Sequence, residues 1–164
     1  MIFVSVGTNE ARFDRLLEAV AGLGLGEELV IQYGHSSPAV VPTAEQVDFL
    51  PFEEMGETIR RARAFVTHAG VGSIMVALAD GKRPIVVPRR RALGEAVDDH
   101  QLQVGRRFAE AGLVTLVETP EALCEALARD QEPPAVVPAA SSLAADLRRF
   151  LENAIEPRSA SVAA

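Results

Sequence analysis

The sequence predicts an α/β fold, a Rossmann-like parallel sheet with helices on both of its faces. Short apolar runs rich in Val, Ile and Phe alternate along the chain with longer amphipathic segments, which is the pattern of parallel strands connected by helices. The chain has 164 residues, of which 48% are hydrophobic and 24% are charged, an ordinary balance for one globular domain. We expect this domain to cover residues 1–155 and a disordered tail to follow at 156–164.

The apolar runs predict six short strands, because each run is brief and ends near a glycine, a proline or a polar residue. In chain order these strands are expected at 2–6, 29–33, 47–50, 64–67, 84–88 and 114–117. Between the second and third strands, residues 35–45 are polar and contain proline, which predicts a loop.

Helical periodicity is clearest at 12–23, where four apolar residues fall on one face: Phe13, Leu16, Leu17 and Val20. Further helices are expected at 53–62, 73–80 and 99–111. Another is expected after Thr119, which can cap its N-terminus, with Pro120 at its first position. A linker is expected at 131–140 and a last helix at 141–155. The lone cysteine, Cys124, excludes a disulfide framework and favours a reducing compartment. Its helical setting predicts that it is buried.

The composition excludes several classes of function. A net charge of −7, no Trp and one Tyr argue against general nucleic-acid binding. No apolar run is long enough to span a bilayer, and the N-terminus lacks the features of a signal peptide. The basic run Arg89–Arg91 is a local exception to the acidic balance. It leaves room for contact with an anionic ligand, such as a donor phosphate, or with an anionic membrane, and the alternative is a run of solvated charges.

Three loops follow predicted strands at the edge where open parallel sheets bind ligands. Gly7 allows close backbone approach, and the Thr8 hydroxyl can donate to a phosphate, although an ordinary capped turn would look the same. The loop from His68 to Ser73 exposes backbone N–H groups at a helix N-terminus, which favours anions, although it could also be a plain glycine-rich turn. In the third loop, Asp99 and Gln101 could hold sugar hydroxyls, or the acidic residues could cap the helix.

Three segments together resemble glycosyltransferase family 28. They read Phe-Val-Ser-Val-Gly-Thr at 3–8, Thr-His-Ala-Gly-x-Gly-Ser-Ile at 67–74, and Pro-Ile-Val-Val-Pro-Arg followed by Gly-Glu-x-x-Asp-Asp-His-Gln within 84–101. More specifically, the chain resembles short stand-alone forms of that family's C-terminal domain. Examples are the small catalytic subunit of the dolichol-linked N-acetylglucosaminyltransferase and the small subunit of bacterial exopolysaccharide glucuronosyltransferases. The resemblance covers about residues 1–155.

This resemblance implies the donor-binding half of a GT-B fold. It implies a hexosyltransferase that uses a UDP-sugar and no metal or other cofactor, and that transfers the sugar to a lipid-linked saccharide in polysaccharide or glycolipid synthesis. A separate membrane-associated subunit would bind the acceptor and hold the protein at the cytoplasmic face of the membrane. The alternative is a non-catalytic nucleotide-sugar-binding or scaffold subunit. A Rossmann-type oxidoreductase is disfavoured, because no G-x-G-x-x-G follows the first strand.

The resemblance also assigns roles to single residues. It places His68 as the group that stabilises the diphosphate and Phe52 in the segment that contacts uracil. Arg89 is a candidate anion contact because of its charge, and not because of the resemblance. The other donor-binding residues that the resemblance implies are Gly7, Thr8, Gly70, Gly72, Ser73, Asp99 and Gln101. Relatives often carry a ribose-binding carboxylate early in the helix after the glycine loop, where this chain has Ile74–Ala77 and no carboxylate near Val76. Glu95 or Asp98 could supply one instead.

Overall fold

The computed structural model describes residues 1–39, 41–129 and 133, so the predicted linker, last helix and disordered tail lie outside the described residues. The strands are β1 (Ile2–Ser5), β2 (Leu29–Gln32), β3 (Ala44–Val47), β4 (Ala64–Thr67), β5 (Ile85–Val86) and β6 (Thr115–Leu116). The α-helices are α1 (Asp14–Gly22), α2 (Phe52–Arg61), α3 (Val71–Ala79), α4 (His100–Glu110) and α5 (Pro120–Ala128), and a short 3-10 turn covers Arg91–Leu93.

All six strands are parallel and lie in the order β3-β2-β1-β4-β5-β6. This order confirms the predicted Rossmann-like sheet. The first three strands extend the sheet from β1 in the middle to β3 at one edge. The chain then returns to the middle, where β4 pairs with β1, and β5 and β6 extend the sheet to the other edge. The strands β1 and β4 are therefore neighbours whose connections leave in opposite directions, which creates a crevice at their carboxyl ends.

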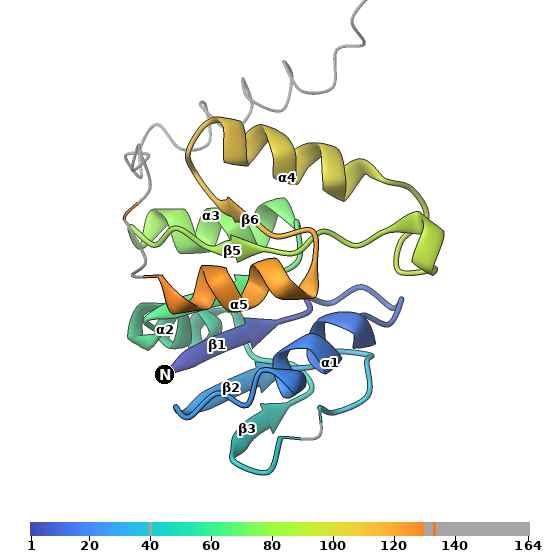
Figure 1. The fold of residues 1–164 in the computed structure, drawn as a ribbon. Helices are drawn as coiled ribbons and strands as arrows, with labels where there is room; N and C mark the ends of the chain where they lie inside the picture. The colour runs from blue at the N-terminus through green and yellow to red at the C-terminus, as the bar shows by residue number, and fades with distance from the viewer. Residues whose placement is uncertain (40, 130–132, 134–164) are drawn as a thin grey trace, which may run out of the picture.

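Helices cover both faces of the sheet, as predicted (Figure 1). On one face, α1 and α5 pack against Val4, Ile31 and Val66 of the three central strands. On the other face, α2 packs near Phe3 and Phe65, while α3 and α4 cover the half of the sheet that holds β5. Because the strands are buried from both sides, they need no alternation of polar and apolar residues, which explains their continuous apolar runs.

Three central strands share one pattern, in which three apolar residues are followed by one polar residue. They read Ile-Phe-Val-Ser in β1, Leu-Val-Ile-Gln in β2 and Ala-Phe-Val-Thr in β4. The register places Ser5 beside both Gln32 and Thr67, and all three side chains are buried. The Ser5 hydroxyl donates to Gln32 Oε1 at 2.6 Å. The carboxyl ends of these strands therefore form a polar patch below the crevice.

Two predictions about the chain outside the central strands were wrong. The third strand lies at Ala44–Val47 rather than at 47–50, because this edge strand is only half-buried and its Glu45 and Gln46 gave no apolar signal. The apolar residues Phe49 and Leu50 instead lie in the segment that leads to α2. Cys124 is exposed rather than buried. No helix among the described residues has both the length and the apolar character needed to cross a bilayer.

The stacked pair Phe3 and Phe65 gives a test of the core. The two rings come from paired positions of β1 and β4, are 5.1 Å apart between centroids, and are at most 2% exposed. We expect Phe3→Ala to lower the free energy of unfolding by about 3–5 kcal/mol, because it opens a cavity in a dense core. Urea unfolding measures this value. Phe49→Ala, at a ring that is 42% exposed, is the control, and equal losses for the two variants would contradict the packing described here.

Candidate functional site

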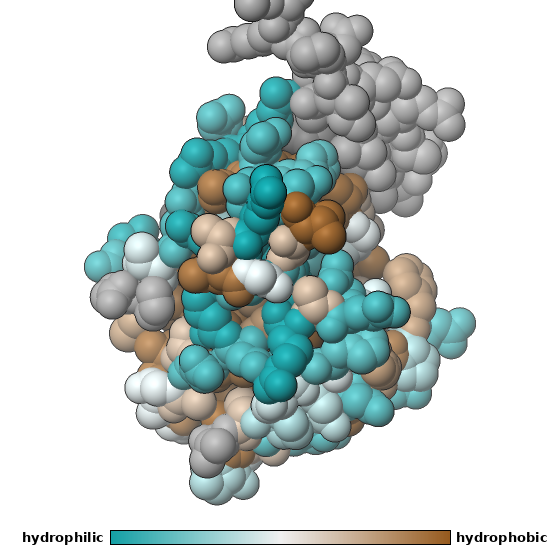
Figure 2. All heavy atoms as spheres, turned by 90° about the vertical axis from the view of Figure 1, so that its right-hand side faces the viewer, coloured by the Kyte–Doolittle hydropathy of each residue, from teal (hydrophilic) through white to brown (hydrophobic). Residues whose placement is uncertain are grey.

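A cleft of about 550 Å³ opens at the carboxyl ends of β1 and β4, where the strand order reverses. Figure 2 looks toward this end of the molecule and shows apolar residues as separate patches among polar ones. The cleft brings together eight residues predicted from the sequence: Gly7, Thr8, Phe52, His68, Gly70, Gly72, Ser73 and Gln101. It is also lined by residues that were not predicted as site residues: Ser5, Asn9, Gln32, Leu50, Met55 and Val76.

The imidazole of His68 lies against the backbone of Gly7 and Gly70. A Cβ atom at Gly7 would overlap Cε1 of the ring, and a Cβ atom at Gly70 would overlap Nε2. Gly7 also has a positive φ of 79°, a conformation that side chains other than glycine rarely adopt. The two glycines are therefore needed because the histidine ring fills the space where their side chains would be.

His68 is neutral at pH 7 in this setting. Burial, and secondarily the positive charge of Arg89, lower the pKa of His68 from 6.5 to about 4. A neutral imidazole has one donor nitrogen and one acceptor nitrogen. Its Nδ1 is 3.3 Å from the Thr67 hydroxyl, so contact with that hydroxyl leaves Nε2 as the ring nitrogen toward Gly70. The ring can thus offer one hydrogen bond to a ligand without carrying a charge of its own.

The N-terminus of α3 opens into the same cleft. Gly70 precedes the helix, no side chain caps this end, and the first helical hydrogen bond runs from Ile74 N–H to the Gly70 carbonyl at 3.1 Å. The N–H groups of Val71–Ser73 are therefore left without helical partners, as in every α-helix. Together with the helix dipole they favour an anion. When the Thr67 hydroxyl donates to Nδ1, Nε2 carries the ring proton, and His68 and this helix end then present hydrogen-bond donors to one shared space.

The third predicted loop contributes only in part. Gln101 lines the cleft, and its Oε1 accepts from the backbone N–H of Arg89 at 3.2 Å. Asp99 is exposed at the start of α4, where its carboxylate accepts from the Arg91 N–H at 3.0 Å. It does not line the cleft. The two residues are two positions apart, and such residues point to different sides of a helix, so they do not form the pair that the sequence suggested.

The structure corrects the prediction that Arg89 is an anion contact. Its side chain is fully buried and donates to backbone carbonyls, so it does not reach a ligand in the cleft. Glu95, considered as a substitute ribose ligand, is also buried, and its carboxylate accepts two hydrogen bonds from Arg15. Asp98 accepts from the His100 N–H at 3.0 Å and does not line the cleft. Neither carboxylate replaces the one that is missing near Val76.

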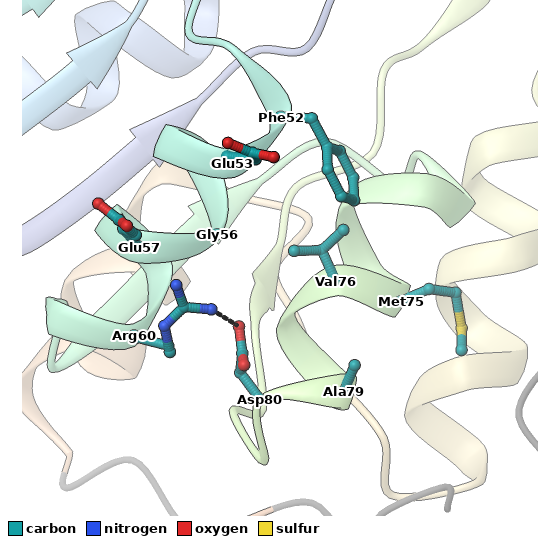
Figure 3. Close-up of a pocket in the computed structure, with 9 residues that line it drawn as sticks. All are labelled: Phe52, Glu53, Gly56, Glu57, Arg60, Met75, Val76, Ala79 and Asp80. Carbon is teal, nitrogen blue, oxygen red and sulfur yellow. Dashed lines mark hydrogen bonds and ion pairs between the residues drawn. The ribbon is translucent and has the colours of Figure 1, made fainter. Parts of the chain in front are cut away.

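A second hollow, of about 530 Å³, lies between α2 and α3 and borders the cleft. Phe52 and Val76 line both spaces, and Figure 3 shows them on facing helices. Farther along the same groove, Arg60 and Asp80 form an ion pair at 3.5 Å. Since the Phe52 side chain is 72% exposed, it presents an apolar surface at the border of the two hollows.

The contact between His68 and Gly70 gives a matched test. We expect Gly70→Ala to lower the free energy of unfolding by about 1–3 kcal/mol, because the new methyl group displaces the imidazole. Gly72→Ala is the control, since nothing lies within 4 Å of its added Cβ, and alanine favours a helix. Urea unfolding of both variants, and of Gly70→Ala combined with His68→Ala, measures the effect. The packing is contradicted if Gly70→Ala costs the same with and without His68.

Comparison with solved structures supports the fold. The chain is similar to the calicheamicin glycosyltransferase CalG4, with a TM-score of 0.60, 22% identity, and coverage of 93% of this chain and 37% of that one. It is similar to the kitacinnamycin glycosyltransferase, with a TM-score of 0.63, 22% identity, and coverage of 94% and 43%. It is similar to MurG of Acinetobacter baumannii, with a TM-score of 0.52, 20% identity, and coverage of 76% of this chain and 39% of that one. The chain thus spans about two fifths of the length of these GT-B structures.

Comparison with sequences assigns the family. A search of curated proteins found no significant match. The profile of the glycosyltransferase family 28 C-terminal domain matches residues 1–155, the span over which the sequence motifs predicted this resemblance. The match includes the cleft and every residue that lines it. The chain therefore belongs to the glycosyltransferase family 28 C-terminal domain family.

Proposed function

We propose that this protein is the donor-binding, catalytic subunit of a hexosyltransferase, which transfers a sugar from a UDP-sugar to a lipid-linked saccharide. The observation that carries the proposal is the pairing of a neutral His68 with the open N-terminus of α3 in one cleft. This arrangement suits a diphosphate, which accepts several hydrogen bonds from neutral donors. The family membership supports glycosyl transfer as the reaction.

The lining of the cleft favours one orientation of a bound UDP-sugar. The diphosphate would lie against Gly7, His68 and the first turn of α3. The uracil would extend toward the apolar end of the cleft, where Leu50, Phe52 and Met55 lie. The transferred sugar would then be near Gln101, whose Nε2 amino group has no protein partner among the described residues and can donate to a hydroxyl.

The proposed chemistry relies on hydrogen-bond donors rather than on a metal. In glycosyl transfer, negative charge develops on the departing diphosphate, and fixed donors aimed at that charge lower the barrier. The N–H groups at the start of α3 and the ring of His68 would act in this way. The hydroxyl of Ser73 in the first turn of α3 would add a further donor.

We propose that a membrane-associated subunit binds the acceptor and covers the carboxyl edge of the sheet. This chain has about two fifths of the length of the GT-B structures that it resembles. Large apolar side chains are exposed in the segments that follow β3 and β5: Phe49, Phe52, Leu93 and Val97. Such a partner would hold the protein at the cytoplasmic face of the membrane and supply the base that activates the acceptor.

Val76 favours a second candidate, a nucleotide-sugar-binding subunit that does not catalyse transfer. It lines the cleft in the part of α3 where related transferases often carry a ribose-binding carboxylate. The side chain of a valine cannot form a hydrogen bond with a ribose hydroxyl. Both candidates predict donor binding. They differ in turnover, because only the catalytic subunit transfers sugar when the acceptor-binding chain is present.

Calorimetric titration of the purified chain with UDP tests the proposed binding. We expect binding by the unaltered protein and an affinity about tenfold lower for His68→Ala, because one hydrogen bond to a charged group is lost. His100→Ala, the same substitution at an exposed histidine that does not line the cleft, should bind within about twofold of the original. Absence of UDP binding by the unaltered protein would refute the proposed function. Sugar transfer should then be measured with and without a candidate membrane-associated, acceptor-binding protein.

A bound UDP-sugar should also raise the pKa of His68. The free protein disfavours the charged ring, whereas a nearby diphosphate favours it. Binding therefore takes up a proton, and the affinity should increase as the pH falls from 6.5 toward 4. A UDP-sugar is the suitable probe, because its diphosphate diester does not titrate in this range. NMR titration of the imidazole signals, assigned with His68→Ala, measures the shift, and an unchanged pKa would exclude contact with the diphosphate.

A further inference from the structure

The Arg89 side chain is the most unusual buried group in the molecule. It lies three residues after the end of β5, and its side chain is fully excluded from solvent. The neighbouring Arg91 is exposed, so the arginine run is divided between the interior and the surface. Arginine stays charged in proteins, and removing that charge from water is costly unless it is well hydrogen-bonded.

The Arg89 guanidinium connects two loops that are far apart in the sequence. Its Nη2 donates to the Val6 carbonyl at 2.9 Å. Its Nη1 donates to the carbonyls of Ala11, Arg12 and Glu95 at 2.6, 3.2 and 3.1 Å. The Phe13 ring lies 4.7 Å from the guanidinium carbon, a favourable position for a cation. The loop after β1 is thereby fixed to the loop after β5.

These two loops form parts of the cleft, although the Arg89 side chain does not line it. Val6 is followed by Gly7 and Thr8, which do line the cleft, and the Arg89 N–H donates to Gln101 Oε1 at 3.2 Å. A change of the Arg89 side chain would therefore affect the cleft through the loop that holds Gly7 and Thr8, and it would not remove a group that lines the cleft.

The positive charge of Arg89 is incompletely compensated. Glu95 accepts from it only through its backbone carbonyl, because the Glu95 carboxylate is occupied by Arg15 at 2.8 and 2.9 Å and by the Arg90 N–H at 2.9 Å. The Arg89 Nε is buried and has no hydrogen-bond partner among the residues that the structure describes. Burial lowers the pKa of Arg89, and the charge of Glu95 acts in the opposite direction. A largely uncancelled cation thus lies behind the cleft, where it disfavours the charged form of His68.

We propose that Arg89 is a positioning residue whose buried charge makes the cleft select ligands that carry a diphosphate. This inference rests on the proposed function. Charges buried in protein are screened by salt much less than exposed ones. The selectivity for UDP over uridine, which has the same base and ribose and no phosphate, should therefore depend on Arg89 and persist at high ionic strength.

The test compares the affinities of UDP and uridine, by calorimetry and NMR titration, for the full chain and for its variants. Arg89→Gln removes the charge and keeps an amide donor. We expect its preference for UDP over uridine to fall about tenfold or more, a loss consistent with one charge interaction at an intermediate dielectric. Arg91→Gln, which removes the same charge from the exposed neighbour, is the control and should keep the preference within about threefold.

The outcomes separate this inference from the proposed function. If the unaltered protein does not bind UDP, the proposed function fails before Arg89 is tested. If a folded Arg89→Gln variant binds both ligands less tightly by the same factor, or keeps the original preference, the inference is overturned. If this variant does not fold, Arg89→Lys tests the inference instead, because lysine keeps the positive charge and cannot donate to all the backbone carbonyls that Arg89 contacts. A preference for UDP within about threefold of the original would support the inference, and a larger loss would overturn it.

Discussion

The divergence of the chain after β1 and β4 is the constraint on which the candidate site depends. These two strands are paired in the middle of the sheet, and their connections leave it on opposite sides. Glycines at positions 7 and 70 leave room between the two loops, so the side chain of a residue on one loop can lie against the backbone of the other. His68 occupies this position, and it allows only glycine at positions 7 and 70. The conformation of both loops and the opening of the cleft follow from that one contact.

A chain with a net charge of −7 can still present a site for an anion, because recognition of a small ligand depends on the local field. The cleft contains backbone N–H groups at the start of α3, and Arg89 lies buried behind it. Its polar patch at Ser5 and Gln32 carries no formal charge. The excess acidic residues lie elsewhere on the surface, where solvent screens them over about 10 Å. Overall charge therefore argues against a nucleic-acid partner without arguing against a diphosphate.

The sequence was sufficient for five of the six expected strands, for the five expected helices that fall in the described residues and for most of the cleft lining, because each depends on local rules. Continuous apolar runs mark buried strands, and loops after neighbouring parallel strands meet at one edge. The sequence failed where a residue's role depends on distant partners. Nothing near Arg89 indicates that the carbonyls of Val6 and Ala11, about 80 residues away, would enclose its charge. In contrast, Ser5 and Gln32 could have been found, since each ends an apolar strand with a polar residue.

The borders of the cleft explain why a further protein surface would strengthen it. The floor is polar at Ser5 and Gln32, whereas Phe52 on the lining is exposed and apolar. Phe49, Leu93 and Val97, in the segments that follow β3 and β5, are exposed apolar side chains as well. Hydrogen bonds to an anion weaken when water competes for the same donors, and they strengthen as the local dielectric falls. A surface that covered these apolar residues would bury them favourably and exclude water from the donors at His68 and α3. Association and charge stabilisation would then be coupled, because both follow from closing the same edge of the sheet.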